Sequence, residues 1–176
     1  MGGPIHWKTL IDNPNTKQGS LNGLLQAISG GEQLKREDYN AINSALAQCG
    51  SPAKIGDGFG STETWAPTHV HVGGFNTPGT LGYTLAPVYA RIVDPETMQE
   101  KQIGEAGLLI VRTPGMMLRY HDNPDETDKV FWLDENGAKW YITGDVVMQT
   151  KENSDEFKFV GRLKRNFVSG VDNIYP

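Results

Sequence analysis

Residues 24–60 read LLQAISGGEQLKREDYNAINSALAQCGSPAKIGDGFG, and this stretch decides the fold. Its apolar start, residues 24–28, predicts a buried strand that ends at Gly30-Gly31. Residues 34–49 predict a helix, because their apolar side chains recur on one stripe and the charged side chains lie outside it. Residues 53–55 open a second strand. The pattern is therefore strand, helix, strand.

A strand–helix–strand unit predicts two parallel strands joined by a right-handed crossover. The glycine turns at residues 30–31 and 58–60 would then both follow the carboxyl ends of neighbouring strands. Ligands bind open α/β sheets at that edge. The segment Gly58–Thr64 adds an aromatic ring, a hydroxyl group and a carboxylate, which suit the base, a phosphate and the Mg²⁺ of a nucleotide. Nucleotide chemistry is the leading hypothesis.

Residues 79–162 follow a different pattern, with short alternating or apolar runs separated by turn residues. This spacing predicts antiparallel strands in a meander or a small barrel. The expected strands are Tyr89–Val93, Gly107–Arg112, Trp140–Met148 and Phe157–Val160. We therefore expect a mixed α/β fold, in which a partial parallel β-α-β unit is followed by an antiparallel β-meander or small distorted β-barrel.

The composition excludes several classes of protein. A net charge of -5 over 176 residues argues against nucleic acid as the main partner, which usually needs a basic face. Cys49 is the only cysteine, so a disulfide framework is excluded and a buried structural thiol is expected. The longest apolar run, near residues 108–111, is too short to span a membrane, and the first residues do not resemble a signal peptide. A cytoplasmic location is the simple expectation.

The chain resembles the adenylate-forming (AMP-binding) enzymes, which include AMP-forming acyl-CoA synthetases, luciferase and the adenylation domains of peptide synthetases. The matching segments, in order, are Leu25–Leu34, Gly58–Glu63, Gly104–Leu108, Tyr141–Asp145 and Gly161–Lys164. The resemblance implies three parts: a partial α/β nucleotide-binding subdomain at 1–70, an antiparallel β-barrel-like subdomain at 71–162, and a hinge with the stub of a C-terminal domain at 163–176.

The family reaction that this resemblance implies has two steps. The carboxylate of an acid, here expected to be fatty or aryl, attacks the α-phosphate of ATP and gives an acyl-adenylate and pyrophosphate. A thiol, usually that of coenzyme A, then displaces AMP. The implied cofactors are ATP/AMP and Mg²⁺, with coenzyme A as co-substrate.

The resemblance also implies roles for the residues of the glycine motif. Phe59, which follows Gly58, would stack on adenine. Thr62 would bind the α-phosphate and Glu63 would help hold Mg²⁺, so these two are the expected catalytic contributors. The resemblance places Gly30, Gly31 and Glu32 beside adenine and the acyl group. It places Asp145 and Arg162 at the ribose, and Lys164 at the hinge.

The chain departs from the family pattern at Arg119, Ile142 and Val171, where glycine, arginine and glycine are usual. It also lacks the family's glycine-rich phosphate loop and the lysine of the C-terminal domain. Stabilising developing charge is usually the largest catalytic effect. We therefore expect a truncated fragment that is inactive as a ligase by itself. Because its strand edges are unpaired, we also expect its α/β part to associate with another copy or to be partly disordered. The alternative is a non-catalytic nucleotide-binding or protein-interaction module.

Each site residue also has an ordinary structural explanation. Phe59 could be a core aromatic at a strand end, and Glu63 could cap a helix or face solvent. Asp145 could be a turn residue, since Gly-Asp pairs are common in turns. Arg162 and Lys164 could belong to a solvated face of a strand.

Two further features have competing interpretations. His69 and His71 lie on one side of an expected strand, but without a further ligand of suitable spacing we expect surface or loop histidines rather than a metal site. Trp65 either borders an acyl pocket or is a core tryptophan.

Overall fold

The computed structural model describes residues 2–32, 34–71, 79–151, 156–163, 167–169 and 172–174. The chain forms two compact units, each assembled from separate segments of sequence. The first unit holds Met1–Gly60 and His69–Tyr83, and the second holds Ser61–Thr68 and Thr84–Pro176. The three-part division expected from the sequence stays a prediction.

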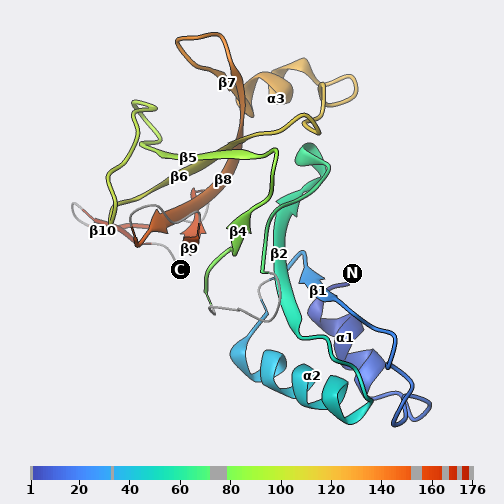
Figure 1. Cartoon of the computed structure of the whole chain (residues 1–176). Coiled ribbons are helices and arrows are strands. Elements are labelled where there is room, and N and C mark those ends of the chain that lie inside the picture. Colours follow the sequence, from blue (N-terminus) through green and yellow to red (C-terminus); the bar gives the residue numbers. More distant parts are fainter. Residues whose placement is uncertain are drawn as a thin grey trace. The chain divides into compact units, whose positions relative to one another are not determined.

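The first unit contains a parallel β-α-β arrangement. Its elements are α1 (Pro4–Ile11), β1 (Ala27–Gly30), α2 (Arg36–Gln48) and β2 (Ile55–Ser61), seen at the blue and cyan end of the ribbon in Figure 1. β1 and β2 are parallel, with Ala27 opposite Ile55 and Gly30 opposite Gly58. The mixed α/β fold and the strand–helix–strand prediction are confirmed.

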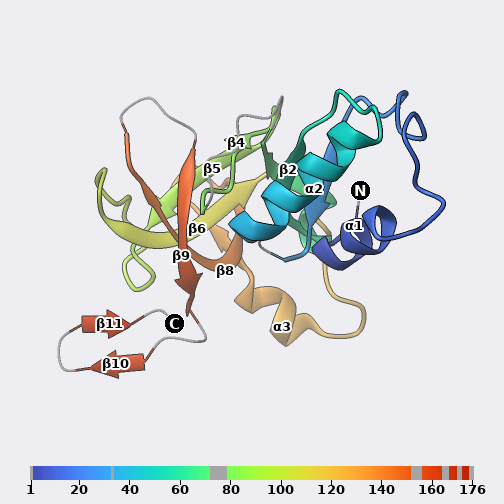
Figure 2. The same cartoon turned by 90° about the horizontal axis from the view of Figure 1, so that it is seen from below.

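The core of the first unit lies where α2 covers the two parallel strands. Leu34, Ile42 and Leu46 are buried there together with Ile55 of β2. α1 lies beside α2 (Figure 2) and contributes Trp7, whose indole N–H donates to the Ile28 carbonyl at 3.2 Å. The apolar stripe that predicted the helix is therefore also what holds it in place.

The sheet continues in the order β1-β2-β3-β4. The 3₁₀ turn η1 (Thr62–Thr64) separates β2 from β3 (Ala66–Val70), and β4 (Tyr83–Thr84) comes last. Beyond the end of β3, the backbone N–H of His71 donates to the carbonyl of Asp57 on β2 at 2.9 Å.

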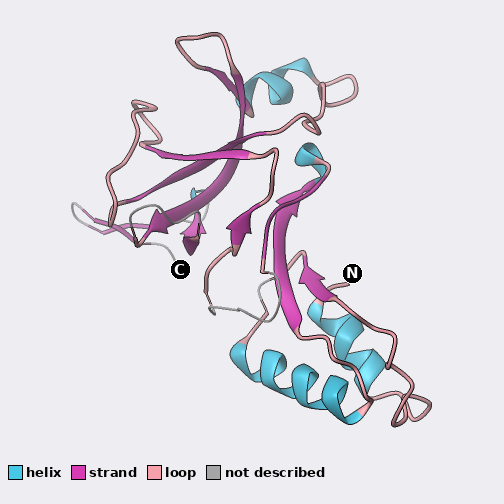
Figure 3. Cartoon of the chain, viewed as in Figure 1, coloured by secondary structure: helices cyan, strands magenta, loops and turns pink. Residues whose placement is uncertain are grey.

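The second unit is built on an antiparallel sheet. Its further elements are β5 (Tyr89–Val93), β6 (Ala106–Arg112), α3 (Pro124–Lys129), β7 (Phe131–Leu133), β8 (Lys139–Gln149), β9 (Phe157–Arg162), β10 (Phe167–Ser169) and β11 (Asp172–Ile174). The strand order is β5-β6-β8-β7, β9 pairs with β8, and β10 and β11 form a separate antiparallel pair. The strands expected from the sequence are all present, in an open sheet rather than a closed barrel (Figure 3).

One buried cluster of this unit lies on a single face of the sheet. Val93 of β5, Leu108 and Ile110 of β6, and Trp140 of β8 are buried together, with Ile142 packed against them. Alternate residues of a strand share a face, which explains the two-residue spacing within β6 and β8. No helix in the described part of the chain is long and apolar enough to cross a membrane.

Two expectations about the first strands are corrected. β1 begins at Ala27, and Leu25 before it is 82% exposed, because an apolar run alone does not fix where a strand starts. Gly58, Phe59 and Gly60 do not form a tight turn, since they lie within β2 and the chain turns only at η1. Glycine accepts the extended conformation as readily as a turn, so the motif could not distinguish them.

The expectations for the histidines and Trp65 are also corrected in part. His69 and His71 are 0% and 3% exposed, so the surface interpretation is wrong. A ring nitrogen of His71 lies 2.9 Å from the Thr80 hydroxyl, and the ring of His69 meets Phe59 edge to face. Trp65 is 80% exposed and has a φ of 53°, so it is not a core tryptophan. Cys49 is buried as a free thiol, as expected.

Candidate functional site

A short capped turn presents two of the predicted site residues in the second unit. Thr62 and Glu63 lie in η1, directly after Ser61. The Thr64 hydroxyl accepts from the Ser61 N–H at 3.2 Å and donates to the Ser61 carbonyl at 3.0 Å, which closes the turn on itself. Thr62 is exposed, so its hydroxyl is accessible to a ligand.

The Glu63 carboxylate is held by Tyr120, a residue 57 positions further along the chain. The Tyr120 hydroxyl donates to Glu63 Oε1 at 2.8 Å. Tyr120 is anchored in turn, because its backbone N–H donates to the hydroxyl of Thr127 in α3 at 3.0 Å. The Met117 N–H also donates to the Glu63 carbonyl at 2.7 Å, so both the backbone and the side chain of Glu63 are fixed.

These contacts keep Glu63 ionised. Burial by itself would raise the pKa of Glu63, but hydrogen bonds from Tyr120, the backbone, Ser61 and Tyr141 outweigh it and lower the pKa below its usual value. The pKa of Tyr120 is raised, by burial first and then by the neighbouring carboxylate, so the phenol stays protonated and continues to donate. The pair therefore presents one negative charge with a fixed orientation.

An irregularity in β8 places Asp145. The β6–β8 register shifts between Leu108 and Ile110, and Gly144 at this point has a φ of +74°. The Thr143 hydroxyl stabilises the distortion by donating to the Leu109 carbonyl at 2.8 Å and accepting from the Asp145 N–H at 3.1 Å. Bulges of this kind redirect side chains next to functional sites, and glycine is the residue that tolerates the positive φ.

Asp145 lies opposite Arg162 on β9 and pairs with it. Arg162 Nε donates to Asp145 Oδ1 at 2.8 Å, with side-chain exposures of 63% and 4%. Burial raises the pKa of Asp145 and the Arg162 charge partly offsets this rise. Within the described residues Oδ2 of Asp145 accepts no hydrogen bond, so one acceptor remains for a ligand. The turn interpretation of Asp145 is wrong, because the residue is a buried member of β8.

Tyr141 connects these groups. It lies in β8, and the charges of Glu63, Asp145 and Arg162 act on its hydroxyl. Its pKa is raised, mainly by burial. The predicted phosphate-side and ribose-side residues Thr62, Glu63, Asp145 and Arg162 all lie in the second unit, and the charges of the last three act on Tyr141, a residue without a predicted role.

The first unit holds the remaining predicted residues. Gly30 at the end of β1 is paired with Gly58 of β2, so the two glycine motifs are neighbours, as predicted. Gly31 follows with a φ of +85° and Glu32 is exposed. Phe59 is half-buried, with its ring centroid 5.8 Å from that of His69. Lys164 and Val171 lie outside the described residues.

Asp57 is a candidate that sequence reasoning missed. It precedes Gly58 and shares a face of β2 with Phe59. Its Oδ1 atom is buried and has no hydrogen-bond partner among the described residues, and the same is true of the hydroxyl of Ser29, the residue opposite it on β1. Burial raises the pKa of Asp57 to about 6, against the lowering effect of the Leu34 N–H. Burial also lowers the pKa of His69 to about 4, so its ring is neutral.

The charged groups fit a hard cation held largely by its substrate. Mg²⁺ prefers oxygen ligands and often uses only one or two protein carboxylates beside substrate phosphates and water. Glu63 supplies one ionised carboxylate, and no cluster of three His, Cys, Asp or Glu side chains occurs in the part of the chain that is described. Glu63 could therefore supply one oxygen ligand to Mg²⁺.

Comparisons with known proteins show the family to which the chain is similar. The family model described as AMP-binding enzyme matches residues 1–121. The Bacillus subtilis protein YdaB, whose name marks it as an unproven acyl-CoA ligase, is 32% identical over 175 residues, covering 98% of this chain and 32% of its own length. The long-chain-fatty-acid–CoA ligase of Bacillus subtilis is 28% identical, covering 99% of this chain and 29% of its own length.

Solved structures show the same fold. Apo MatB from Rhodopseudomonas palustris superposes with a TM-score of 0.78 at 26% identity, covering 100% of this chain and 33% of that chain. ATP-bound MatB gives a TM-score of 0.76 at 25% identity, covering 99% of this chain and 33% of that chain. The chain spans about a third of the length of the relatives that it matches.

Proposed function

The chain belongs to the AMP-binding enzyme family, and on that basis we propose that it is part of an AMP-forming acyl-CoA ligase. The whole enzyme joins the carboxylate of a fatty or aryl acid to the α-phosphate of ATP and releases pyrophosphate. The thiol of coenzyme A then attacks the acyl carbon of the adenylate, and AMP leaves. Two curated relatives carry ligase names of this kind, and the structural relative MatB binds ATP.

In the second unit, the residues around Tyr141 would bind the ribose and the phosphates. Asp145, fixed by Arg162, accepts hydrogen bonds from ribose hydroxyls through its open oxygen. Thr62 donates its exposed hydroxyl to the α-phosphate. Glu63 would hold Mg²⁺, which when bound neutralises phosphate charge.

In the first unit, Phe59 would stack on the adenine ring, and the backbone at residues 30–32 and Gly58 would border the base and the acyl group. Asp57 adds a buried acceptor two residues before Phe59 on the same strand. We assign it to an N–H of the base, because a buried acceptor without a partner is costly unless a ligand supplies one.

Tyr120 is a positioning residue rather than a catalytic one. It touches Glu63 and keeps that carboxylate ionised and oriented. The glutamate side chain has several rotatable bonds. Because the Tyr120 hydroxyl holds its carboxylate at 2.8 Å, less side-chain conformational entropy is lost when a ligand binds.

The observation that carries this proposal is the buried Asp145 with one oxygen paired and the other open. AMP binding to the 176-residue chain, measured by calorimetry, should be lost in Asp145→Ala and retained in Asp128→Ala, which removes an exposed carboxylate of α3. Equal binding in both variants would contradict the assignment, and absence of binding in all forms would mean that the ribose site is not complete in this chain.

We further propose that the 176-residue chain is catalytically incompetent and that Lys164 acts as a hinge in the whole enzyme. Release of pyrophosphate from ATP with any carboxylic acid, above a metal-only control, would contradict the incompetence. A non-catalytic nucleotide-binding or protein-interaction module is the second candidate. AMP binding together with a complete lack of turnover in the protein as it occurs in the cell would support that candidate.

A further inference from the structure

A polar hollow lies in the second unit, away from the residues around Tyr141. Its volume is about 560 Å³, within the range of small-molecule sites, and it is formed by β5, the segment before β5, Arg112 and Trp140. Trp140 and Tyr141 are adjacent in β8, so their side chains lie on opposite faces of the strand. The hollow is therefore separate from the nucleotide residues.

Two arginines occupy the core-side face of the sheet at this point. Arg91 shares a face of β5 with the core residue Val93, and Arg112 shares a face of β6 with Ile110. Charged residues at core-facing positions break the usual pattern and call for a reason. Both guanidinium groups lie against the Trp140 ring, at 4.5 and 5.5 Å from its centroid.

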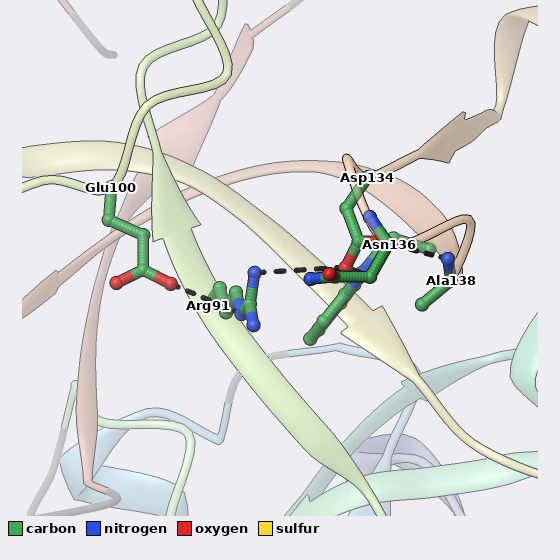
Figure 4. Close-up of polar contacts among 6 residues, drawn as sticks. Arg91, Glu100, Asp134, Asn136 and Ala138 are labelled. Carbon is green, nitrogen blue, oxygen red and sulfur yellow. Dashed lines mark hydrogen bonds and ion pairs between the residues drawn. The ribbon is translucent and has the colours of Figure 1, made fainter.

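The charge of Arg91 is already balanced. Its Nε atom lies 3.1 Å from Glu100, and a second nitrogen lies 4.0 Å from Asp134 (Figure 4). Asp134 is held in place, because it accepts from the Trp140 indole at 3.0 Å and from the Ala138 N–H at 2.8 Å. Neither carboxylate pairs with Arg112.

Arg112 has no such partner. Within the described residues it makes no ion pair and no hydrogen bond, and its guanidinium lies over the rings of Tyr89, at 4.8 Å, and Trp140. Ring stacking fixes the group but uses none of its five N–H donors. Thr84, which also lines the hollow, has a buried hydroxyl without a partner among the described residues. A half-buried, pre-oriented fork of donors beside an unpaired hydroxyl matches an oxyanion.

We propose that this hollow binds a small organic anion, with a carboxylate or phosphate group on Arg112 and Thr84 and an apolar body against Ala86 and Val88. The bidentate geometry of arginine suits both oxyanions. The alanine and valine side chains carry no hydrogen-bonding group, so they favour an apolar ligand body. The site is distinct from the proposed nucleotide site and does not depend on it.

The test uses the 176-residue chain and four probes: benzoate, phenyl phosphate, inorganic phosphate and uncharged benzamide. Binding is followed through the indole N–H signals in NMR, with the signal of Trp140 identified by its loss in Trp140→Phe. Saturable shifts of that signal are expected with at least one aryl anion and not with benzamide. A response to benzoate alone identifies a carboxylate ligand, and a response to phenyl phosphate alone identifies a phosphate ester.

Arg112→Gln should weaken binding about tenfold or more, the loss expected for one charge-assisted contact. Arg119→Gln, which removes an exposed arginine of the same unit, should leave it unchanged. If Arg112→Gln does not fold, Thr84→Val and Arg112→Lys provide the test. Thr84→Val keeps the side-chain volume and Arg112→Lys keeps the positive charge, and each should weaken binding of the anion. No saturable binding of any aryl anion, equal binding of benzamide, or equal affinity in the folded Arg112 and Thr84 variants would overturn the proposal.

Discussion

Asp57→Asn should stabilise the protein at neutral pH and not at acidic pH. Burial raises the pKa of Asp57 from 3.8 to about 6. The folded chain therefore binds more protons than the unfolded chain between these values, and its stability falls as the pH rises through them. Asparagine has nearly the same shape, keeps an acceptor for the Leu34 N–H, and never ionises.

The size of the effect follows from the same shift. A rise of roughly two pH units corresponds to about 3 kcal/mol at full strength. Asp57 is only half-buried, so solvent screening reduces this to about 1–2 kcal/mol. The wild-type chain should lose that amount relative to the variant between pH 4 and pH 8, which corresponds to about 0.5–1 M in the midpoint of urea unfolding.

The assay is urea unfolding of both proteins at pH 4 and pH 8, followed by circular dichroism. The quantity compared is the stability difference at pH 8 minus that at pH 4, because this cancels effects of the substitution that do not depend on charge. Asp128→Asn, at an exposed position of α3, is the matched control and should show no such change. A stability difference that is the same at both pH values would refute the argument that Asp57 carries an uncompensated buried charge.

Three other substitutions test the second unit and the core of the first unit. Tyr120→Phe should raise the pKa of Glu63, seen by NMR titration of its carboxyl carbon, and should weaken Mn²⁺ binding in the presence of AMP; an unchanged pKa would mean that the 2.8 Å contact contributes nothing. Arg162→Gln should destabilise the chain by about 1–2 kcal/mol at pH 8 and less at pH 4, where Asp145 becomes protonated; urea unfolding at both values decides this. Leu46→Ala should cost about 3 kcal/mol in thermal or urea unfolding, since the side chain is fully buried, and a loss below about 1 kcal/mol would contradict the packing described.

Local patterns predicted much of the fold. The expected strand Tyr89–Val93 has the bounds of β5, and the expected helix differs from α2 by two residues at its start and one at its end. These segments have clear periodicity and are bounded by turn residues, so the local sequence is sufficient to predict their secondary structure and bounds. The start of β1 was wrong because Leu24 and Leu25 satisfy the same apolar rule as a strand without being part of one.

The site was harder to predict, because it depends on contacts between distant segments. The sequence motifs predicted roles for Glu63 and Asp145, but nothing local indicates that the Tyr120 hydroxyl would donate to Glu63 or that the charges of both carboxylates would act on Tyr141. Asp57 was missed for a related reason: its significance comes from burial without a partner, and burial is a property of the assembled sheet.

The two units of this chain are discontinuous in sequence, and this restricts where segments can be exchanged with a homologous gene. The chain passes from one unit to the other after Gly60, Thr68 and Tyr83, and the first passage falls inside the Gly58–Thr64 motif. A crossover between two homologous genes inside residues 61–83 would combine pieces from different parents in both units at once, whereas a crossover outside this range would do so in one unit only. We expect viable recombinants to inherit residues 61–83 as one block from a single parent.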